Sequence, residues 1–222
     1  MKAAWLNHNG NSRLLIFFSG WGMNDAPVRH LSAGCRDVLV FYDFRNLDIV
    51  PFLTEIAKFQ DIALVAWSLG CAAANRTALQ CRWSLSAALA VNGTLTPDND
   101  LTGIPSRWIA ATVRNLPSGG WGKFIARMCP DKNLRPLFSD APPDRSLAQS
   151  AEELLTLQQL APPQDCIFNS ALISTADRII LPDHQRRGWE SYNVPVHTIA
   201  APHYPFTLWT EWEDLLNAGN DN

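Results

Sequence analysis

Three polar residues of this sequence stand directly after apolar runs, in an order that suits nucleophilic catalysis. Ser68 follows the run IALVAW, Asp177 ends the run SALISTAD, and His203 comes two residues after VHTIAA. A serine hydroxyl becomes an effective nucleophile when a histidine takes its proton, and a carboxylate then holds the imidazole in the required tautomer. The three residue types therefore predict acyl transfer through a covalent serine intermediate.

The serine lies in a short motif, AWSLG at residues 66–70, with small residues two positions before and two positions after it. Small residues there let a strand turn sharply into a helix, as in the nucleophile elbow of α/β-hydrolases. Ala66 stands where glycine is usual, and a methyl group is the smallest side chain that can be added. The motif alone is weak, because a serine can equally cap a buried helix. The chain order serine, acid, histidine at three strand ends is what favours the hydrolase interpretation.

Two further parts of the expected site are the acid and the oxyanion donors. Asp177 is the preferred acid, and Asp98 and Asp100, which follow the preceding strand, are the alternatives. Two backbone N–H groups should stabilise the negative oxygen that develops in the reaction. One is that of Leu69, at the start of a helix whose dipole favours negative charge. The other is that of Trp21, which lies between two glycines after the first buried run.

Six short apolar runs predict the strands that must position these groups: 13–19, 38–44, 62–67, 86–93, 170–177 and 196–201. Most of them are nearly continuous in hydrophobicity, which is typical of a parallel sheet covered on both faces. Helices are expected at 69–81, 183–191 and 205–217. This alternation predicts the α/β class, namely an α/β-hydrolase fold with a mostly parallel, doubly wound sheet.

One long segment, residues 94–169, interrupts the alternation of strands and helices and contains nine prolines. A structureless loop of that length is uncommon in a compact domain. The segments 119–129 and 150–160 have the pattern of amphipathic helices. We therefore expect a single domain over residues 1–222 that carries a small helical cap insertion at about 94–169.

Composition excludes several other functions. The chain has 222 residues, of which 47% are hydrophobic, enough for one well-filled core. No apolar run approaches the roughly 20 residues that span a bilayer, and the N-terminus lacks a signal peptide, so we expect a cytoplasmic protein. The five cysteines have no CxxC spacing and the five histidines no HExxH spacing, so no metal and no cofactor are expected. The net charge of −3 gives no reason to expect nucleic acid as a partner.

Five motifs together resemble those of a known family: SGWGMN, AWSLG, AVNGT, STADRIILPDHQRRGW and PHYPF. They are similar to the BioG-type pimeloyl-acyl-carrier-protein methyl ester esterases of biotin synthesis, from about residue 13 to the C-terminus and most weakly in the cap. GWG and the elbow are also similar to the related BioH type, but the alanine of AWS, the motif AVNGT and the short chain favour BioG.

The resemblance implies a particular site and reaction. It implies that Ser68, Asp177 and His203 form a catalytic triad, and that Trp21 and Leu69 lie at the oxyanion site. It also implies hydrolysis of the methyl ester of pimeloyl-acyl-carrier protein, which yields pimeloyl-carrier protein and methanol. The expected partner is therefore an acyl carrier protein, and the enzyme is expected to act as a monomer.

The distribution of charge is consistent with such a partner. Residues 107–145 contain seven Lys or Arg and three Asp, a balance of +4, whereas the rest of the chain carries −7. Acyl carrier proteins are acidic, and a basic patch steers an acidic partner during association. Lys123 and Arg127 are four residues apart and share one face if the segment is helical. With Arg135 they are the candidate docking residues, although each of them could equally belong to a solvated surface.

Two other functions remain open at the level of the sequence. One is a general serine esterase or thioesterase on small acyl esters, in which the cap selects a different acyl chain. The other is a binding protein that has the hydrolase fold but no activity. The three residues in triad order count against the second alternative.

Overall fold

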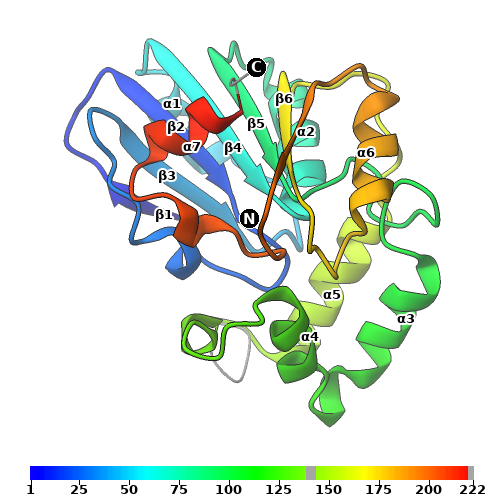
Figure 1. The fold of residues 1–222 in the computed structure, drawn as a ribbon. Helices are drawn as coiled ribbons and strands as arrows, with labels where there is room; N and C mark the ends of the chain where they lie inside the picture. The colour runs from blue at the N-terminus through cyan, green and yellow to red at the C-terminus, as the bar shows by residue number, and fades with distance from the viewer. Residues whose placement is uncertain (139–143, 220–222) are drawn as a thin grey trace.

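The computed structural model describes residues 1–138 and 144–219, and within them a seven-stranded sheet forms the centre of the molecule (Figure 1). The strands are β1 (Lys2–Asn7), β2 (Arg13–Phe18), β3 (Asp37–Tyr42), β4 (Asp61–Trp67), β5 (Ala87–Val91), β6 (Ser170–Ser174) and β7 (Val196–Ile199). Their order in the sheet is β1-β3-β2-β4-β5-β6-β7. Strand β1 is antiparallel to β3, and the other neighbours are parallel, so the predicted mostly parallel sheet is confirmed.

Helices follow most of the parallel strands and cover the sheet. They are α1 (Val50–Ile56), α2 (Gly70–Cys81), α3 (Ser106–Asn115), α4 (Gly120–Met128), α5 (Leu147–Gln158), α6 (Pro182–Glu190) and α7 (Trp212–Ala218). Short 3₁₀ turns occur at Ala26–Val28, Leu116–Ser118, Arg135–Phe138 and Phe206–Leu208. In Figure 1, α7 lies in front of the sheet and α2 behind it, so both faces of the central strands are covered.

The continuous apolar runs form the buried middle of the sheet. Residues 14–18 of β2 and 63–66 of β4 are fully inaccessible to solvent. Because both faces of these strands are covered, neither face needs polar residues, which is why the runs do not alternate. The register places Ala66 beside Phe18 on one side and Ala90 on the other, so three strand ends meet at the point where β4 turns into α2.

The first strand was not expected from the sequence. The segment KAAWLN lies at the edge of the sheet, and its residues are half-buried or exposed. It lacks the continuous hydrophobicity of the central strands because only one neighbour, β3, covers it. An edge strand of this kind is specified by its pairing, which is not visible in its composition.

The helix expected at 205–217 is wrong in its first half. The chain instead forms the 3₁₀ turn Phe206–Leu208, becomes extended, and enters α7 only at Trp212. The reason is a tertiary pairing, since Ser32 donates to the Thr210 carbonyl at 2.8 Å and accepts from the Trp212 N–H at 3.2 Å. These bonds require extended backbone where local propensity favoured a helix.

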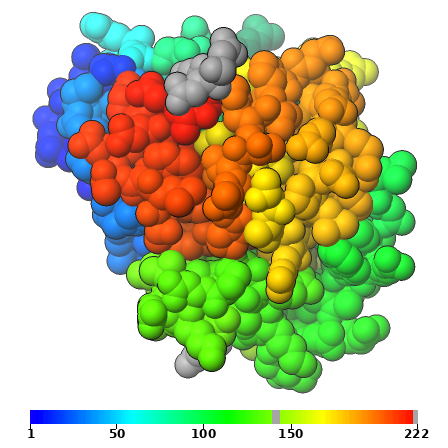
Figure 2. All heavy atoms as spheres, in the orientation of Figure 1, coloured from blue at the N-terminus to red at the C-terminus, as the bar shows by residue number. Residues whose placement is uncertain are grey.

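Among the described residues between β5 and β6, the helices α3, α4 and α5 lie together beyond the carboxyl ends of the strands (Figure 1). We term residues 94–138 and 144–169 the cap. Helix α5 begins with a capping box in which Ser146 and Gln149 each bond the other's backbone N–H. In Figure 2 the cap, coloured green, covers the lower side of the molecule beneath the C-terminal segments. Among the described residues, none of the helices has the length and hydrophobicity needed to cross a membrane.

The junction of β4 and α2 gives a first prediction, for the substitution Gly70→Ala. A Cβ at Gly70 would lie 2.2 Å from the Ser19 carbonyl oxygen and 2.7 Å from that of Phe18, both backbone atoms. We expect the free energy of unfolding, measured by urea denaturation, to fall by about 1–3 kcal/mol or more. Gly122→Ala is the control, because no atom lies within 4 Å of its added Cβ. Alanine in that helix should raise stability by about 0.5–1 kcal/mol, and equal losses in both variants would contradict the prediction.

Candidate active site

Ser68 occupies a sharp turn between β4 and α2. Its φ angle is +58°, in the left-handed region that non-glycine residues rarely adopt. Its N–H donates to the Val91 carbonyl at 2.9 Å, and helix α2 begins two residues later at Gly70. Gly93 also approaches closely, since a Cβ there would lie 2.7 Å from the Ser68 carbonyl oxygen. Gly70 and Gly93 are thus required by close backbone contacts around the serine, as the elbow motif predicts for Gly70.

The structure brings together the three residues that the sequence singled out. Nε2 of His203 lies 2.9 Å from Oγ of Ser68, and Nδ1 of His203 lies 2.7 Å from Oδ2 of Asp177. The three residues are 5%, 1% and 4% exposed in the order Ser68, His203, Asp177. This is the hydrogen-bond arrangement expected from the sequence for a nucleophile, a base and an orienting carboxylate.

The carboxylate of Asp177 accepts hydrogen bonds from other donors in addition to the histidine. Its Oδ1 accepts from the N–H groups of Ile179 at 2.7 Å and Ile180 at 3.1 Å. Its Oδ2 accepts from Nε2 of Gln185 at 2.8 Å as well as from His203. These donors fix the plane of the carboxylate. Gln185 was missed in the sequence because a glutamine on a short polar helix carries no signal that it is buried.

The alternative acids and the neighbouring thiol lie in other environments. Asp98 accepts from the Ser106 hydroxyl and from Gln158, and Asp100 accepts from the Ser106 N–H at the start of α3. Neither carboxylate contacts His203.

Cys71 is fully buried, its thiol donates to the Ala66 carbonyl, and burial raises its pKa well above the ordinary value, so it is not a competing nucleophile.

Two side chains at strand ends donate hydrogen bonds to the loop that carries His203. The His203 carbonyl accepts from Nε1 of Trp67 and from Nδ2 of Asn92, each at 3.0 Å. Asn92 also donates to the Ser174 hydroxyl at 2.7 Å and accepts from the Ser174 N–H at 2.6 Å. The asparagine of AVNGT therefore joins the ends of β5 and β6 to the histidine loop, a role that its spacing in the sequence did not reveal.

Trp21 and Leu69, which carry the two expected oxyanion donors, line the same pocket as Ser68. A turn closed by the bond from the Met23 N–H to the Gly20 carbonyl at 3.1 Å carries Trp21, and Leu69 directly follows Ser68. Within the described part of the chain, neither the Trp21 nor the Leu69 backbone N–H has an acceptor. Two unsatisfied backbone donors next to a serine hydroxyl suit an oxygen that becomes negative.

The side chain of Trp21 is buried, at 4% exposed, and packs into the cap. Its ring makes edge contacts with Trp121 and Phe124, with centroids 5.6 and 4.8 Å apart. Its Nε1 donates to the Ser150 carbonyl of α5 at 2.7 Å. Trp21 thus combines a free backbone N–H with a side chain that anchors its loop.

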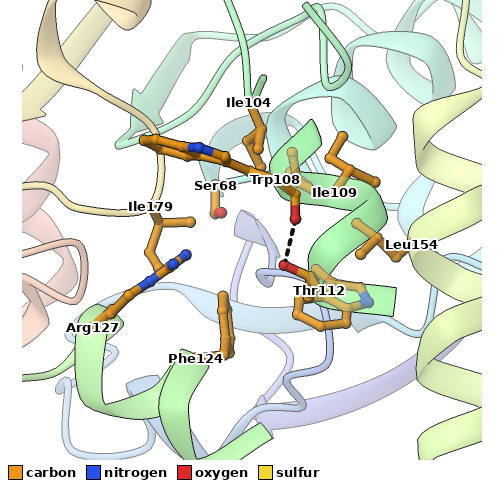
Figure 3. Close-up of a pocket in the computed structure, with 11 residues that line it drawn as sticks. Ser68, Ile104, Trp108, Ile109, Thr112, Phe124, Arg127, Leu154 and Ile179 are labelled. Atoms are coloured by element: carbon orange, nitrogen blue, oxygen red, sulfur yellow. Dashed lines mark hydrogen bonds between the residues drawn. The ribbon is translucent and has the colours of Figure 1, made fainter. Parts of the chain in front are cut away.

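An apolar pocket lies over the serine, with its walls supplied mainly by the cap (Figure 3). Its lining residues are Trp21, Ser68, Leu69, Ile104, Trp108, Ile109, Thr112, Phe124, Arg127, Leu154 and Ile179. In Figure 3, Trp108 of α3 and Ile179 lie near Ser68, and Arg127 extends from α4 toward the same space. Most of this lining is apolar, which suits an uncharged acyl chain, and Arg127 is the charged group within it.

The basic residues of the cap differ in their exposure to solvent and in the bonds that they already make. Lys123 and Arg127 are exposed on α4, and within the described residues neither forms an ion pair. Arg135 is half-buried, and its guanidinium donates to the carbonyls of Cys129 and Pro130. Arg145 is buried against Glu153 and adds nothing to the surface. The regional balance of +4 therefore overstates the charge that a partner can reach.

The fold and the geometry at Ser68 define the class of protein, an α/β-hydrolase. An esterase from Exiguobacterium antarcticum shares this fold, with a TM-score of 0.74 at 12% sequence identity over 99% of this chain and 95% of that one. At that level of identity the similarity concerns the fold alone.

The family follows from closer similarities. The family model described as pimeloyl-ACP methyl esterase BioG matches residues 1–215, so the chain belongs to the BioG family. The crystal structure of BioG from Haemophilus influenzae has a TM-score of 0.86 at 31% identity, over 97% of this chain and 100% of that one. The resemblance inferred from the motifs is confirmed.

A longer relative is a malonyl-[acyl-carrier protein] O-methyltransferase from Bacteroides fragilis. It is 32% identical over 193 residues, which are 86% of this chain and 39% of that protein. This chain therefore corresponds to less than half the length of that relative.

The turn that carries Trp21 gives a second prediction, for the substitution Gly22→Val. Gly22 has a φ of +75°, and a Cβ there would lie 2.5 Å from the Trp121 ring. The turn must shift and carry the Trp21 N–H away from the serine, so kcat on p-nitrophenyl butyrate should fall by about 10²–10³. Gly10→Val is the matched control, because its φ of +79° imposes the same strain with nothing within 4 Å. An unchanged kcat in folded Gly22→Val protein would place the oxyanion donor elsewhere.

Proposed function

We propose that this protein is a serine esterase that hydrolyses the methyl ester of pimeloyl-acyl-carrier protein and releases methanol. The observation that carries the proposal is the buried chain of hydrogen bonds from Ser68 through His203 to Asp177, at 2.9 and 2.7 Å, on the floor of an apolar pocket. Membership of the BioG family, whose description names a pimeloyl-ACP methyl esterase, supports this substrate.

In the proposed first half-reaction the serine is acylated. Oγ of Ser68 attacks the ester carbonyl carbon while its proton passes to Nε2 of His203. The carbonyl oxygen becomes negative and accepts hydrogen bonds from the Trp21 and Leu69 N–H groups. When the carbon–oxygen bond breaks, His203 returns the proton to the leaving methoxide, and methanol departs. Asp177 stabilises the imidazolium throughout.

In the second half-reaction water replaces methanol. A water molecule gives a proton to His203 and attacks the acyl carbon, and the bond to Oγ of Ser68 then breaks as the proton returns to the serine. The product is a carboxylic acid, which ionises at neutral pH. The apolar side chains of the pocket accommodate the neutral methyl ester well.

The carrier protein would approach the side of the cap that bears Lys123 and Arg127. These residues line a surface groove between α3 and α4, together with Trp108, Ala111, Thr112, Asn115, Gly120 and Phe124. Arg127 and Phe124 belong to both this groove and the pocket over Ser68, so the groove adjoins the reacting centre. Two exposed cations at the entrance suit an acidic partner whose acyl chain must reach the serine.

The serine mechanism gives a third prediction. Ser68→Ala and His203→Ala should remove nearly all esterase activity, and a fluorophosphonate should label the native protein but not Ser68→Ala. Asp177→Asn should lower kcat by about 10⁴, because the imidazole is then held in the wrong tautomer. Asp98→Asn is the matched control and should keep its activity, since Asp98 contacts Ser106 and Gln158 and not His203. Normal turnover in Ser68→Ala would refute the mechanism.

The groove gives a fourth prediction, for the substitution Lys123→Glu. Because rim charges act mainly on association, kcat/KM for the carrier-bound ester should fall roughly tenfold at low salt. The loss should shrink as salt is added, because exposed charges are screened over about 8 Å at physiological ionic strength. Adding Arg127→Glu should deepen the loss on the carrier substrate.

Two controls separate docking from damage to the cap. Lys123→Glu should hydrolyse p-nitrophenyl butyrate at the native rate, because Lys123 is absent from the lining of the pocket over Ser68. Arg76→Glu, which reverses an exposed charge on α2 outside the cap, should behave as wild type on both substrates. Unchanged kcat/KM of Lys123→Glu on the carrier substrate would mean that docking occurs elsewhere.

A further inference from the structure

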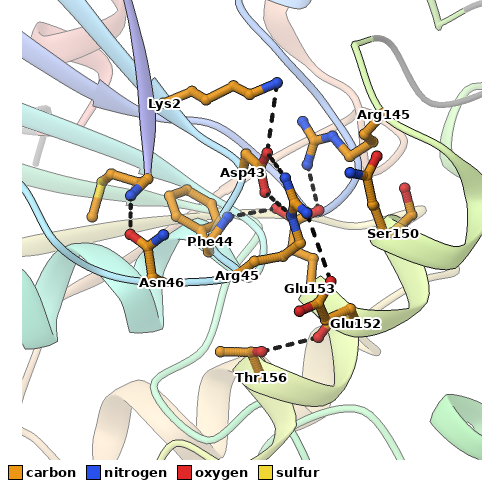
Figure 4. A network of polar contacts seen from close by, with 12 residues as sticks. Lys2, Asp43, Phe44, Arg45, Asn46, Arg145, Ser150, Glu152, Glu153 and Thr156 are labelled. Carbon is orange, nitrogen blue, oxygen red and sulfur yellow. Dashed lines mark hydrogen bonds and ion pairs between the residues drawn. The ribbon is translucent and has the colours of Figure 1, made fainter.

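A buried ion pair of the cap contacts the loop that carries the oxyanion donor (Figure 4). Glu153 of α5 and Arg145, just before that helix, both have side chains fully shielded from solvent. Oε2 of Glu153 accepts from Arg145 and from the Gly22 N–H at 3.1 Å, and Oε1 accepts from the Phe44 N–H at 3.0 Å. Nη2 of Arg145 donates to the Met23 carbonyl.

Three consecutive residues of the loop are therefore bonded to α5 or to its N-terminal flank. The Trp21 indole donates to the Ser150 carbonyl, the Gly22 N–H to Glu153, and the Met23 carbonyl accepts from Arg145. The Gly22 N–H belongs to the peptide that directly follows Trp21. Rotation of this peptide changes the torsion angles on either side of it, and so moves the donor at Trp21.

A buried ion pair need not add to the stability of a fold. Two charges removed from water cost several kcal/mol each, and well-packed apolar side chains of similar volume are often equally stabilising. Burial raises the pKa of Glu153, and Arg145 and the N–H groups of Phe44 and Gly22 oppose that shift. The carboxylate supplies two acceptors at fixed positions for backbone N–H groups, and an apolar side chain supplies none.

We propose that Glu153, supported by Arg145, is a positioning residue for the oxyanion loop. It fixes the Trp21–Gly22 peptide from the cap, so that the Trp21 N–H faces the oxygen of the reacting ester. The residue does not touch the substrate: it is absent from the lining of the pocket, to which its neighbour Leu154 contributes. The inference rests on the proposed serine mechanism, in which that N–H stabilises the developing negative charge.

The sequence contains an indication that Glu153 is buried and paired. The buried positions of α5 are Ser150, Glu153, Leu154 and Leu157, which follow the helical spacing of a single face. Of the two adjacent glutamates, only Glu153 lies on that face with the leucines. A carboxylate at an apolar position of an amphipathic helix requires a buried partner, and Arg145 is that partner.

The test is the double variant Glu153→Leu/Arg145→Met, which removes both charges without leaving one unpaired. We expect kcat on p-nitrophenyl butyrate to fall by about 10- to 100-fold, less than complete loss of an oxyanion donor costs, while KM stays within about threefold. A merely structural role would not separate kcat from KM in folded protein. Glu153→Gln keeps one acceptor for the Gly22 N–H and should recover most of kcat.

Glu152→Gln is the matched control on the same helix. Glu152 has an exposed side chain that pairs with Arg45 and does not contact the loop, so kcat should be unchanged. A folded double variant with kcat within twofold of wild type would overturn the proposal, as would an equal loss in Glu153→Gln. Failure of the serine mechanism itself is recognised separately, by activity that survives in Ser68→Ala.

A measurement on the native protein covers the case in which neither variant folds. Hydrogen exchange of the Gly22 amide should be strongly retarded, because a buried carboxylate accepts its hydrogen. The Gly34 amide, in an exposed loop, is the reference for rapid exchange. Exchange of Gly22 as fast as that of Gly34 would show that Glu153 does not hold this peptide and would overturn the proposal.

Discussion

The turn at Ser68 is the constraint on which the rest of the site depends. A serine at a φ of +58° costs about 1–3 kcal/mol relative to a relaxed backbone. Two backbone contacts keep it in place, the bond from its N–H to Val91 and the close passage of Gly70 under the carbonyls of β2. Both need β2, β4 and β5 to be adjacent and in register. The strained serine is therefore a consequence of the sheet order, and it points the hydroxyl away from the core toward the histidine.

Asp177 and His203 are positioned near that hydroxyl by loops that are hydrogen-bonded to other parts of the chain. Asp177 is fixed by two N–H groups of its own loop and by Gln185, and the His203 loop is fixed by Trp67 and Asn92. The side-chain donors among them, those of Trp67, Asn92 and Gln185, are themselves buried. Such preorganisation is what makes hydrogen-bond donors effective in catalysis, because they do not have to reorganise during the reaction.

The cap presents two different surfaces of its helices. Its inner surface is mostly apolar where it forms the pocket, to which Arg127 also contributes, and it carries the buried ion pair of Glu153 and Arg145. Its outer surface carries the exposed cations of α4. Because the same described helices form both surfaces, a change in cap packing can alter the pocket over Ser68 as well as the exposed cations.

The sequence by itself determined the central strands, the elbow and the three residues that meet there. Continuous apolar runs are informative because a parallel sheet buries both faces, and strand ends in a parallel sheet lie at one edge. It did not determine the edge strand β1, the extended chain before α7, or the buried contacts of Gln185, Asn92 and Glu153. Each of these depends on a partner far along the chain: β3 for β1, Ser32 for Thr210, and the loop at Gly22 for Glu153. A polar side chain shows no local sign of such a partner, because hydrogen bonds depend on distances that only the tertiary structure sets.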